Sequence, residues 1–432
     1  MKGRMDETLP HIVVVGAGFA GLRFVRNFPE TLARITIVDR QNHHLFQPLL
    51  YQVATAGLSA VDIAQPIRAL FADRPNLAVV MGEVTAIDLA KKQVRHHRGE
   101  LSYDYLVLAA GGTTNYFGHP EWEQFAPGLK TLDDALRIRR LILCALESAE
   151  TETDPAKREA AMTIVVIGGG PTGVEMAGAL AELTRVVVHR DFDKIDTTHA
   201  RVILIEGSDH ILSPFPPELR ESALQQLMKL GVEVKLGRRV EDVRDGELVA
   251  NGEVIRANSI IWGAGVGGAP IARTLGLELD RAGRIKVRPD CSVPGHPTVF
   301  ALGDMISLTD AKGVLVPGVA QGAMQMGKYV ANLIENELRG PAVTPAPRAP
   351  FVYNDKGTMA TIGRASAVAM VKKFKLRGFP AWFAWLAVHL MFLVGFRNRF
   401  SVLMQWMYSY FTYKRGARII TGVSGEKSAC SA

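Results

Sequence analysis

The alternation of apolar and polar stretches takes the same form twice along this chain. A largely apolar run at 11–15 leads into a glycine-rich turn at 16–21, and a second apolar run at 163–167 leads into glycines at 168–173. Runs of this kind, rich in Val and Ile, predict strands buried on both faces of a parallel sheet. We therefore expect an α/β fold with two Rossmann-like dinucleotide-binding domains.

The first glycine turn has the features of a nucleotide site. Gly16, Gly18 and Gly21 have the G-x-G-x-x-G spacing. Glycines at this spacing allow a tight turn, a close approach to a pyrophosphate and close packing of the next helix. The first N–H groups of that helix then face the phosphates. Asp39 ends the next apolar strand, at the place where an acid receives a ribose hydroxyl.

The second unit repeats this plan with one irregularity. Its glycines are Gly168, Gly170 and Gly173, and the acid that ends its next apolar strand is Glu206. This acid lies 38 residues after the first glycine instead of about 20, so we interpret the polar stretch 189–200 as an insertion. No Lys or Arg follows Glu206 within four residues, which favours NADH over NADPH.

A third apolar run closes the pattern of the first domain. Residues 298–303 predict a short strand that ends in Asp304, and residues 319–326 predict the start of a helix. The predicted domains are a first nucleotide domain split into 1–120 and 285–345, a second at 121–284, and a C-terminal segment at 346–432.

Charge changes the interpretation of the C-terminal segment. The net charge is +7, yet residues 356–425 hold eleven Lys or Arg and no Asp or Glu. The same segment contains an uncharged run at 378–396 and an aromatic-rich stretch at 400–413. This combination fits an anionic membrane surface better than nucleic acid. Because basic residues flank the uncharged run on both sides, we favour helices in the membrane plane over a transmembrane helix or a buried helix pair in a soluble dimer.

The cysteines and histidines add little chemistry. Cys144, Cys291 and Cys430 form no close pair and no metal-ligand spacing, so we expect a reducing compartment and no disulfide framework. His43 and His44 are adjacent but have no further ligands near them in sequence, and we expect no metal site. The charged N-terminus is not that of a signal peptide.

The arrangement resembles the FAD-dependent pyridine-nucleotide reductases with two dinucleotide-binding domains. Disulfide reductases of that fold carry a cysteine pair in the segment that here is 43–51, which has no cysteine, so dithiol chemistry is not expected. More specifically, the whole chain is similar to the type II NADH:quinone oxidoreductases, single-subunit enzymes that do not pump protons. The stretches that carry this similarity are 44–51, 168–175, 320–325 and 389–418. Asp39 is a departure, since the family often has Glu there.

The resemblance implies an enzyme that oxidises NADH, with non-covalent FAD as cofactor, and reduces a membrane quinone. It implies catalytic roles for Glu175 beside nicotinamide and flavin, and for Gln321 and Gln325 at the quinone mouth. The expected FAD-binding residues are Gly16, Gly18, Phe19, Ala20, Gly21, Asp39, Arg40, Pro48, Ala110, Gly111, Asp304 and Ala320. The expected NADH-binding residues are Gly168, Gly170, Pro171, Thr172, Gly173, Glu206 and Gly265.

Plainer roles and other functions stay open at this point. Gln321 and Gln325 share one helical face and would also suit packing or capping, and Glu175 would suit a first helical turn. The alternatives to the main hypothesis are a sulfide:quinone oxidoreductase-like flavoprotein and an NADH-binding redox sensor without turnover. The expected location is the cytoplasmic face of the inner (plasma) membrane, as a monotopic protein that does not bind nucleic acid. A homodimer, ubiquinone or menaquinone, and either kinetic order remain open.

Overall fold

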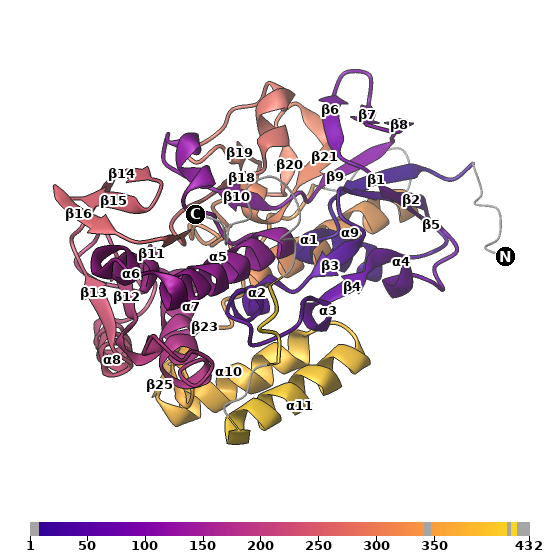
Figure 1. Cartoon of the computed structure of the whole chain (residues 1–432). Coiled ribbons are helices and arrows are strands. Elements are labelled where there is room, and N and C mark those ends of the chain that lie inside the picture. Colours follow the sequence, from indigo (N-terminus) through magenta and orange to yellow (C-terminus); the bar gives the residue numbers. More distant parts are fainter. Residues whose placement is uncertain (1–7, 341–346, 413–415, 421–432) are drawn as a thin grey trace. The chain divides into compact units, whose positions relative to one another are not determined.

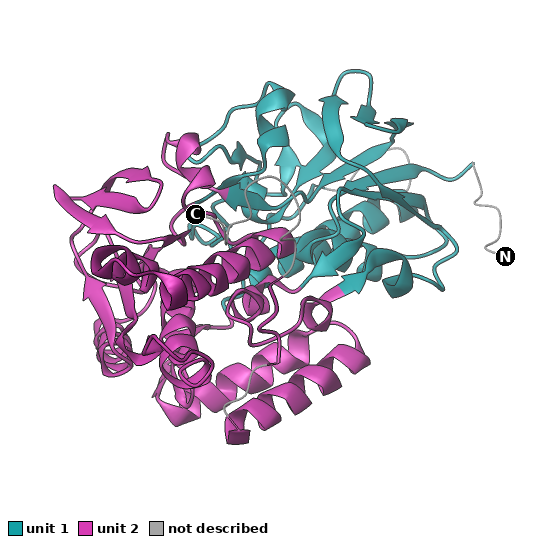
Figure 2. Ribbon diagram, viewed as in Figure 1, with its two compact units in different colours: residues 1–45, 65–113, 266–355 teal, residues 46–64, 114–265, 356–432 magenta. Residues whose placement is uncertain are grey.

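The chain forms two compact units, which differ in colour in Figure 2. The computed structural model describes residues 8–340, 347–412 and 416–420. Unit 1 consists of residues 1–45, 65–113 and 266–355, and unit 2 of residues 46–64, 114–265 and 356–432. These units reflect packing and not bound nucleotides, so the domain boundaries given above stay a prediction.

Unit 1 is built on a six-stranded sheet. In spatial order its strands are β20 (Ser292–Val293), β21 (His296–Ala301), β9 (Tyr105–Leu108), β1 (His11–Val15), β2 (Arg34–Asp39) and β5 (Leu77–Met81). All neighbours are parallel except β20 and β21. Every residue of β1 is buried, as expected of an inner strand in a parallel sheet.

Two helices of unit 1 pack closely against each other, α1 (Phe19–Asn27) and α9 (Ala320–Arg339). The apolar residues of α9 recur three or four positions apart and form one buried stripe. The close approach depends on Gly327, because a Cβ there would lie 2.3 Å from the carbonyl oxygen of Ala20. Unit 1 also contains several smaller elements: β3 (His43–Leu45), β4 (Ala64–Pro66), α4 (Ile67–Leu70), β6 (Val84–Asp88), β7 (Gln93–His96), β8 (Gly99–Ser102), β10 (Gly112–Thr114), β18 (Val266–Gly268), β19 (Ile285–Lys286) and β22 (Ile306–Ser307). The boundary with unit 2 falls within β4 and within β10.

Unit 2 contains a four-stranded parallel sheet. Its strands in spatial order are β13 (Val232–Lys235), β12 (Arg201–Ile205), β11 (Thr163–Ile167) and β17 (Ser259–Trp262), and an antiparallel sheet of β14 (Val240–Arg244), β15 (Glu247–Ala250) and β16 (Glu253–Arg256) accompanies it. The helices of this unit before residue 265 are α2 (Leu50–Ala54), α3 (Ala60–Ile63), α5 (Leu132–Thr151), α6 (Pro155–Ala161), α7 (Pro171–Glu182) and α8 (Pro217–Lys229) (Figure 1). The stretch interpreted as an insertion, 189–200, holds one short 3₁₀ turn, at Thr197–His199.

The two glycine turns have the same backbone geometry. Gly16 and Gly168 adopt φ values of +102° and +108°, a region that favours glycine. A Cβ on Gly21 would lie 1.9 Å from the Gly16 carbonyl oxygen, and one on Gly173 would lie 1.8 Å from that of Gly168. Each turn therefore needs its first and third glycines. The α/β fold with two dinucleotide-type sheets is confirmed.

The C-terminal segment of unit 2 contains a sheet that the sequence analysis did not predict. Strands β23 (Thr358–Gly363), β24 (Ser366–Val371) and β25 (Phe374–Arg377) form an antiparallel sheet ahead of the helices α10 (Phe379–Phe392) and α11 (Phe396–Thr412). Helix α7 lies against β23 at Gly178, where a Cβ would be 1.6 Å from the carbonyl oxygen of Ile362. The sheet thus joins the nucleotide-type part of unit 2 to α10 and α11.

The uncharged run 378–396 is not one continuous helix. Helix α10 ends at Phe392, and Gly395, with a φ of +89°, precedes the start of α11. Among the described residues, no helix has both the length and the apolar character required to cross a membrane.

The cysteines differ in state, which corrects one expectation. Cys291 is a free, fully buried thiol. Cys144 is disulfide-bonded. The expectation of no disulfide is therefore wrong at Cys144. Sequence separation alone does not show which cysteines the fold brings together.

Candidate functional site

In unit 1, Asp39 fastens the first glycine turn to the end of β2. The Ala17 N–H donates to Asp39 Oδ2 at 2.6 Å, and the Gln41 N–H donates to Oδ1 at 2.7 Å. Burial raises the pKa of this carboxyl above its ordinary value, and the two backbone donors oppose the shift. A carboxylate has about four acceptor positions, so this arrangement leaves acceptor capacity for further donors at the turn.

The surroundings of this turn fit a dinucleotide such as FAD. A Cβ on Gly18, at the start of α1, or on Gly111, after β9, would meet no atom within 4 Å. The buried His44 joins its Nδ1 to the Ala17 carbonyl oxygen at 2.8 Å, while its Nε2 has no hydrogen-bond partner among the described residues. Burial lowers the pKa of His44 to about 4, so its ring is neutral. An unpaired buried nitrogen beside an open turn is suited to a polar ligand group.

The N-terminus of α9 lies in the same unit. The helix starts at Ala320, and the side chain of the preceding Val319 does not cap it, so its positive end is suited to a negative group. Gln321 lies half-buried in the first turn. Gln325 is held by a reciprocal pair of bonds, since its Nε2 donates to the Asn354 carbonyl oxygen and its Oε1 accepts from the Asn354 N–H, each at 2.9 Å.

Other expected FAD residues divide between the units. Asp304 is in the short 3₁₀ turn Gly303–Met305 that follows β21 in unit 1. Ala110 follows β9 in the same unit. Pro48 belongs to the 3₁₀ turn Gln47–Leu49, which is part of unit 2.

In unit 2, Glu206 repeats the role of Asp39. The Gly169 N–H donates to Glu206 Oε2 at 2.5 Å, and Oε1 accepts from both the N–H and the hydroxyl of Ser208 at 2.8 Å. The carboxylate therefore fastens the second glycine turn to the end of β12. The sequence analysis predicted the position of both acids but not this structural use.

The remaining residues of the second turn lie as its spacing predicts. Pro171 is the first residue of α7, where its missing N–H leaves no hydrogen bond unmade. Gly170 precedes it in open space, and Thr172 is exposed. Gly265, with a φ of +72°, follows β17 in the same unit.

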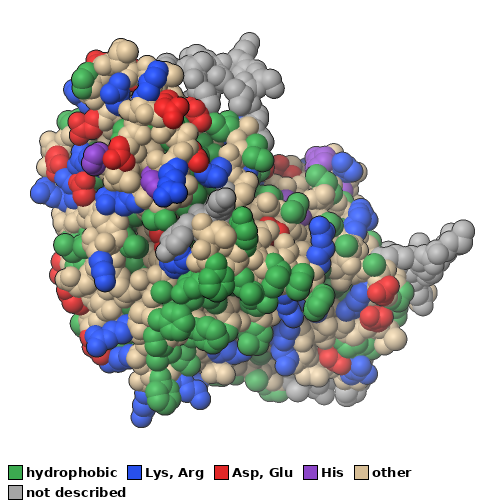
Figure 3. Space-filling model, turned by 60° about the horizontal axis from the view of Figure 1, so that its bottom comes forward, with side chains coloured by type: hydrophobic (Ala, Val, Ile, Leu, Met, Phe, Trp, Pro, Cys, Tyr) green, Lys and Arg blue, Asp and Glu red, His purple; other side chains and the backbone are tan. Residues whose placement is uncertain are grey.

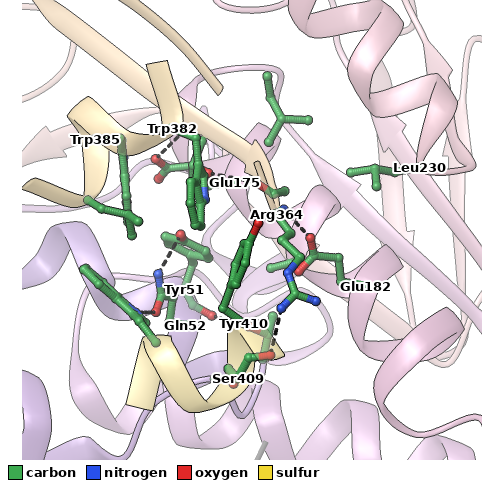
Figure 4. Close-up of a pocket in the computed structure, with 18 of the residues that line it drawn as sticks. Tyr51, Gln52, Glu175, Glu182, Leu230, Arg364, Trp382, Trp385, Ser409 and Tyr410 are labelled. Atoms are coloured by element: carbon green, nitrogen blue, oxygen red, sulfur yellow. Dashed lines mark hydrogen bonds between the residues drawn. The ribbon is translucent and has the colours of Figure 1, made fainter. Parts of the chain in front are cut away.

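A cavity of about 330 Å³ lies within unit 2, beside Glu175 (Figure 4). Its walls come from α2, α7, β23, α10 and α11, which are far apart in the sequence. Five of the lining side chains are aromatic: Tyr51, Trp382, Trp385, Trp406 and Tyr410. The volume is at the lower end of the range for ligand pockets, about 300–1,000 Å³.

Glu175 is the carboxyl group of this cavity with a strongly altered acidity. Burial raises its pKa to about 8, against the opposing effects of the Thr361 N–H, which donates to Oε1 at 3.3 Å, and of the Trp385 indole. The group is therefore largely protonated at neutral pH. A neutral carboxylic acid in an aromatic cavity can give a proton to a bound acceptor.

Two further charged side chains, Glu182 and Arg364, line the cavity. The Arg364 N–H donates to Glu182 Oε1, two helical turns beyond Glu175 on α7. The Arg364 guanidinium lies 4.2 Å from the ring centre of Tyr410 and donates to the Ser409 carbonyl oxygen at 3.1 Å. These contacts connect β23 and α7 to α11.

Helix α11 is polar on its inner face and apolar on its outer face. Inside, Ser401 and Gln405 donate to Asp62 at 2.8 and 2.9 Å, and the Trp406 indole N–H donates to Gln52 Oε1 at 2.8 Å. Outside, apolar side chains gather on the face formed by α10 and α11, which we call the apolar face (Figure 3). Its residues include Phe379, Phe383, Met391, Phe392, Phe396, Phe400, Met407 and Phe411.

The sequence analysis singled out Glu175 but missed its neighbours in the cavity. Thr361 comes from β23, which the sequence analysis does not predict, and Trp385 lies within the uncharged run 378–396, where no pattern connects it to Glu175. No spacing in the sequence connects residues 51, 175, 361 and 385, because the fold alone brings their elements together. Among the described residues, no cluster of His, Cys, Asp or Glu could hold a metal ion.

Comparisons with known proteins agree with this organisation. The model of the pyridine nucleotide-disulphide oxidoreductase family matches residues 10–327, and that of the NDH2 C-terminal domain matches residues 356–414. The chain is 44% identical over 423 residues to the type II NADH:quinone oxidoreductase Ndh of Mycobacterium tuberculosis, covering 95% of this chain and 90% of that protein.

Solved structures show a similar fold at low sequence identity. The structure of NDH2 from Plasmodium falciparum in complex with NADH matches with a TM-score of 0.86 at 20% identity, over 96% of this chain and 100% of that one. The sulfide:quinone oxidoreductase from Aquifex aeolicus matches less well, with a TM-score of 0.68 at 18% identity, over 93% of this chain and 95% of that one.

Proposed function

Since this chain belongs to the type II NADH:quinone oxidoreductases, we propose that it oxidises NADH, passes the electrons through FAD and reduces a membrane quinone without pumping protons. The observation that carries this proposal is the cavity of unit 2, which is lined by the protonated Glu175 and by aromatic side chains of α10 and α11, the helices of the apolar face. Such a cavity suits an apolar acceptor that takes up protons as it is reduced.

When bound, FAD would supply the chemistry that no side chain offers, namely acceptance of a hydride and its release as two electrons and a proton. The glycine turn of unit 1, Asp39 and the orphaned Nε2 of His44 would bind its phosphate and sugar groups. The uncapped N-terminus of α9 and the side chain of Gln321 would face the ring system, where a positive helix end stabilises negative charge.

The second glycine turn would bind the pyrophosphate of NADH, and Glu206 would receive the ribose hydroxyls of its adenosine. We expect a strong preference for NADH, because the carboxylate repels a 2′-phosphate. Glu206→Gln should narrow the preference by at least about ten-fold, since one unit-charge repulsion near a protein surface exceeds about 1.4 kcal/mol. The ratio of kcat/KM for NADH and NADPH measures this. Equal wild-type values would show that Glu206 does not face the 2′ position.

Glu175 is proposed as the proton donor to the quinone, with the aromatic walls of the cavity covering the ring faces. The reaction takes up two protons with each electron pair, so an acid with a pKa near the working pH is favoured for this task. Both the Nε2 and the Oε1 of Gln325 are hydrogen-bonded to the backbone of Asn354. At the quinone mouth that the family resemblance implies for both glutamines, Gln325 would therefore keep its position, and Gln321 would contact the quinone.

The apolar face is proposed to lie in the membrane surface, with α10 and α11 in the plane of the interface. Exposed cations flank α10 and α11 in the sequence, among them Lys372, Lys373, Arg377, Arg397 and Arg399, and their charge suits anionic headgroups. A quinone with an isoprenoid tail would then enter the cavity from lipid. The proposed location is the cytoplasmic face of the inner membrane, where NADH is supplied.

The experiment that tests this function follows the flavin in the two half-reactions by stopped-flow absorbance. Mixing with NADH should bleach the flavin, and a soluble quinone should then restore its absorbance. Bleaching without reoxidation would favour a redox sensor. Reduction by sulfide but not by NADH would favour a sulfide:quinone oxidoreductase.

The same measurement tests Gln321. We expect Gln321→Leu to slow reoxidation by quinone by about ten-fold, the effect of one lost hydrogen bond of about 1.4 kcal/mol. Bleaching by NADH in the same sample is the internal control and should remain nearly unchanged. A selective loss of the NADH step would place the quinone elsewhere.

A further inference from the structure

Trp385 is held rigidly in the wall of the cavity. Only 1% of it is exposed, and its indole stacks on the His389 ring with centroids 4.0 Å apart. Trp406 and Tyr51 pack against it at centroid distances of 5.9 and 6.4 Å. His389 is fixed in turn, because its Nδ1 is 2.7 Å from the Trp385 carbonyl oxygen. The indole therefore has little freedom to turn its N–H elsewhere.

The indole N–H of Trp385 has no hydrogen-bond partner of good geometry among the described residues, although the nitrogen is fully buried. A buried donor without an acceptor is costly, and a native fold rarely keeps one without a use. Because the nitrogen has no exposed surface, a ligand in the cavity does not reach it in this conformation. The carboxyl of Glu175 lines the same cavity (Figure 4). The Trp385 indole lowers the pKa of this carboxyl, which means that it favours the charged form.

We propose that Trp385 is a positioning residue for quinone reduction, whose indole N–H receives the carboxylate of Glu175 once that side chain has given its proton to the quinone. This inference rests on the proposed role of Glu175 as the proton donor. Before the transfer, the neutral carboxyl needs only the Thr361 N–H on Oε1. After it, the new negative charge gains a second donor, and a hydrogen bond to a charged group is stronger than one to a neutral group.

The proton balance of this step is simple. The O–H bond of Glu175 breaks, and its proton forms an O–H bond on one quinone oxygen as the electron pair from NADH arrives. The proton on the other quinol oxygen is the one that the hydride of NADH brings. Trp385 keeps its own proton throughout. The carboxylate then takes a proton from water, which restores the starting state. A fixed donor thus lowers the free energy of the charged state without taking part in the transfer.

No charged side chain competes for this role in the described part of the chain. The shift of Glu175 arises from burial, from the Thr361 N–H and from the Trp385 indole, with no contribution from a neighbouring charge. The titratable or charged groups that face it from the packed elements or lie next to Trp385 are Tyr51 of α2, Glu182 of α7, Arg364 after β23, His389 of α10 and Tyr410 of α11. Glu182 accepts from the backbone N–H of Arg364, the Arg364 guanidinium donates to the Ser409 carbonyl oxygen, and His389 is neutral because burial lowers its pKa to about 4.

The test compares Trp385→Phe with Trp382→Phe in the full-length holoenzyme. Both residues are tryptophans of α10 in the cavity wall, but Trp382 packs against Tyr410 and Phe379, with its ring tilted to theirs. Trp385→Phe should raise the pKa of Glu175 by about one unit, because it removes a donor that favours the charged form. The infrared carbonyl band of the protonated carboxyl, identified by its absence in Glu175→Gln, reports this pKa directly. Trp382→Phe should leave the pKa of Glu175 unchanged.

The kinetic part of the test is a double-mutant cycle. Trp385→Phe should slow flavin reoxidation by a soluble quinone several-fold at neutral pH and move the alkaline limb of its pH profile upward. In the Glu175→Gln background the same change should have no further effect. An unchanged Glu175 pKa in Trp385→Phe, or an equal loss of rate in both backgrounds, would overturn the inference. A shifted pKa with no change in quinone reduction in any variant would instead refute the proton-donor role of Glu175.

Discussion

Replacing Glu175 with Gln should slow the reduction of quinone by about 10²- to 10⁴-fold, the usual contribution of a general acid. Bleaching of the flavin by NADH should change far less, because the proposed proton transfer belongs to the second half-reaction. Stopped-flow absorbance separates the two steps. Glu182→Gln is the matched control, since this glutamate lies on the same helix and lines the same cavity but is bonded to the Arg364 backbone.

The same variant has an expected pH signature. Burial raises the pKa of Glu175 to about 8, so the wild-type quinone step should slow as pH rises through that value. The slow residual rate of Glu175→Gln should be flat over the same range. Equal rates and identical profiles for the two proteins would remove Glu175 from the chemistry.

Protein stability provides an independent check on the sign of this shift. In the unfolded chain Glu175 releases its proton near pH 4.5, its ordinary value, whereas in the folded protein it keeps the proton to about pH 8. Between those values the folded state holds a proton that the unfolded state has lost, so folding becomes less favourable as pH rises. Glu175→Gln removes this cost and should raise Tm at neutral pH. Loss of activity together with a higher Tm would exclude misfolding as its cause.

The sequence predicts the parts of this protein that depend on local backbone rules. The spacing of Gly16 and Gly21, and of Gly168 and Gly173, follows from carbonyl oxygens that leave no room for a Cβ. A steric requirement of this kind leaves a fixed pattern in the sequence. This pattern predicts the fold class, whereas the family follows from the resemblance of the stretches 44–51, 168–175, 320–325 and 389–418.

The cavity leaves no such pattern. Thr361 meets Glu175 across 186 residues of sequence, and this contact depends on a sheet with little local signal. The strands β23 to β25 mix Gly, Ala and Met with a basic hairpin, so their apolar period is weak. Their place becomes clear only from the close approach of Gly178 to Ile362. Tertiary contacts of this kind decide which aromatic residues line the cavity and which stay exposed on the surface of the protein.

Removing three phenylalanines from the apolar face should largely abolish binding to lipid vesicles. Phe396, Phe411 and Phe400 of α11 are 85%, 76% and 57% exposed, so their replacement with Ser costs the fold little. Burying such a side chain in lipid contributes about 1.5–3 kcal/mol. The triple variant should therefore bind vesicles at least about 10³-fold more weakly, as measured by co-sedimentation.

The contacts on the inner face of α11 predict how the loss of vesicle binding would change the turnover of the enzyme. Asp62 and Gln52 hold the helix to unit 2 through polar bonds that the three changes do not touch, so the cavity should stay intact. Turnover with a water-soluble quinone should persist while turnover with a long-tailed quinone in vesicles collapses. Met228→Ser with Val254→Ser is the control, because both residues are more than half exposed on other elements of unit 2.

Salt then separates the two components of binding. The exposed cations around the apolar face contribute about 1 kcal/mol each near an anionic surface, and salt screens that part but not the apolar part. High salt should loosen the wild-type protein from anionic vesicles without releasing it, and should release the triple variant completely. Retention of the triple variant at high salt would contradict the prediction, because it would mean that apolar contacts other than these three phenylalanines hold the protein to the membrane.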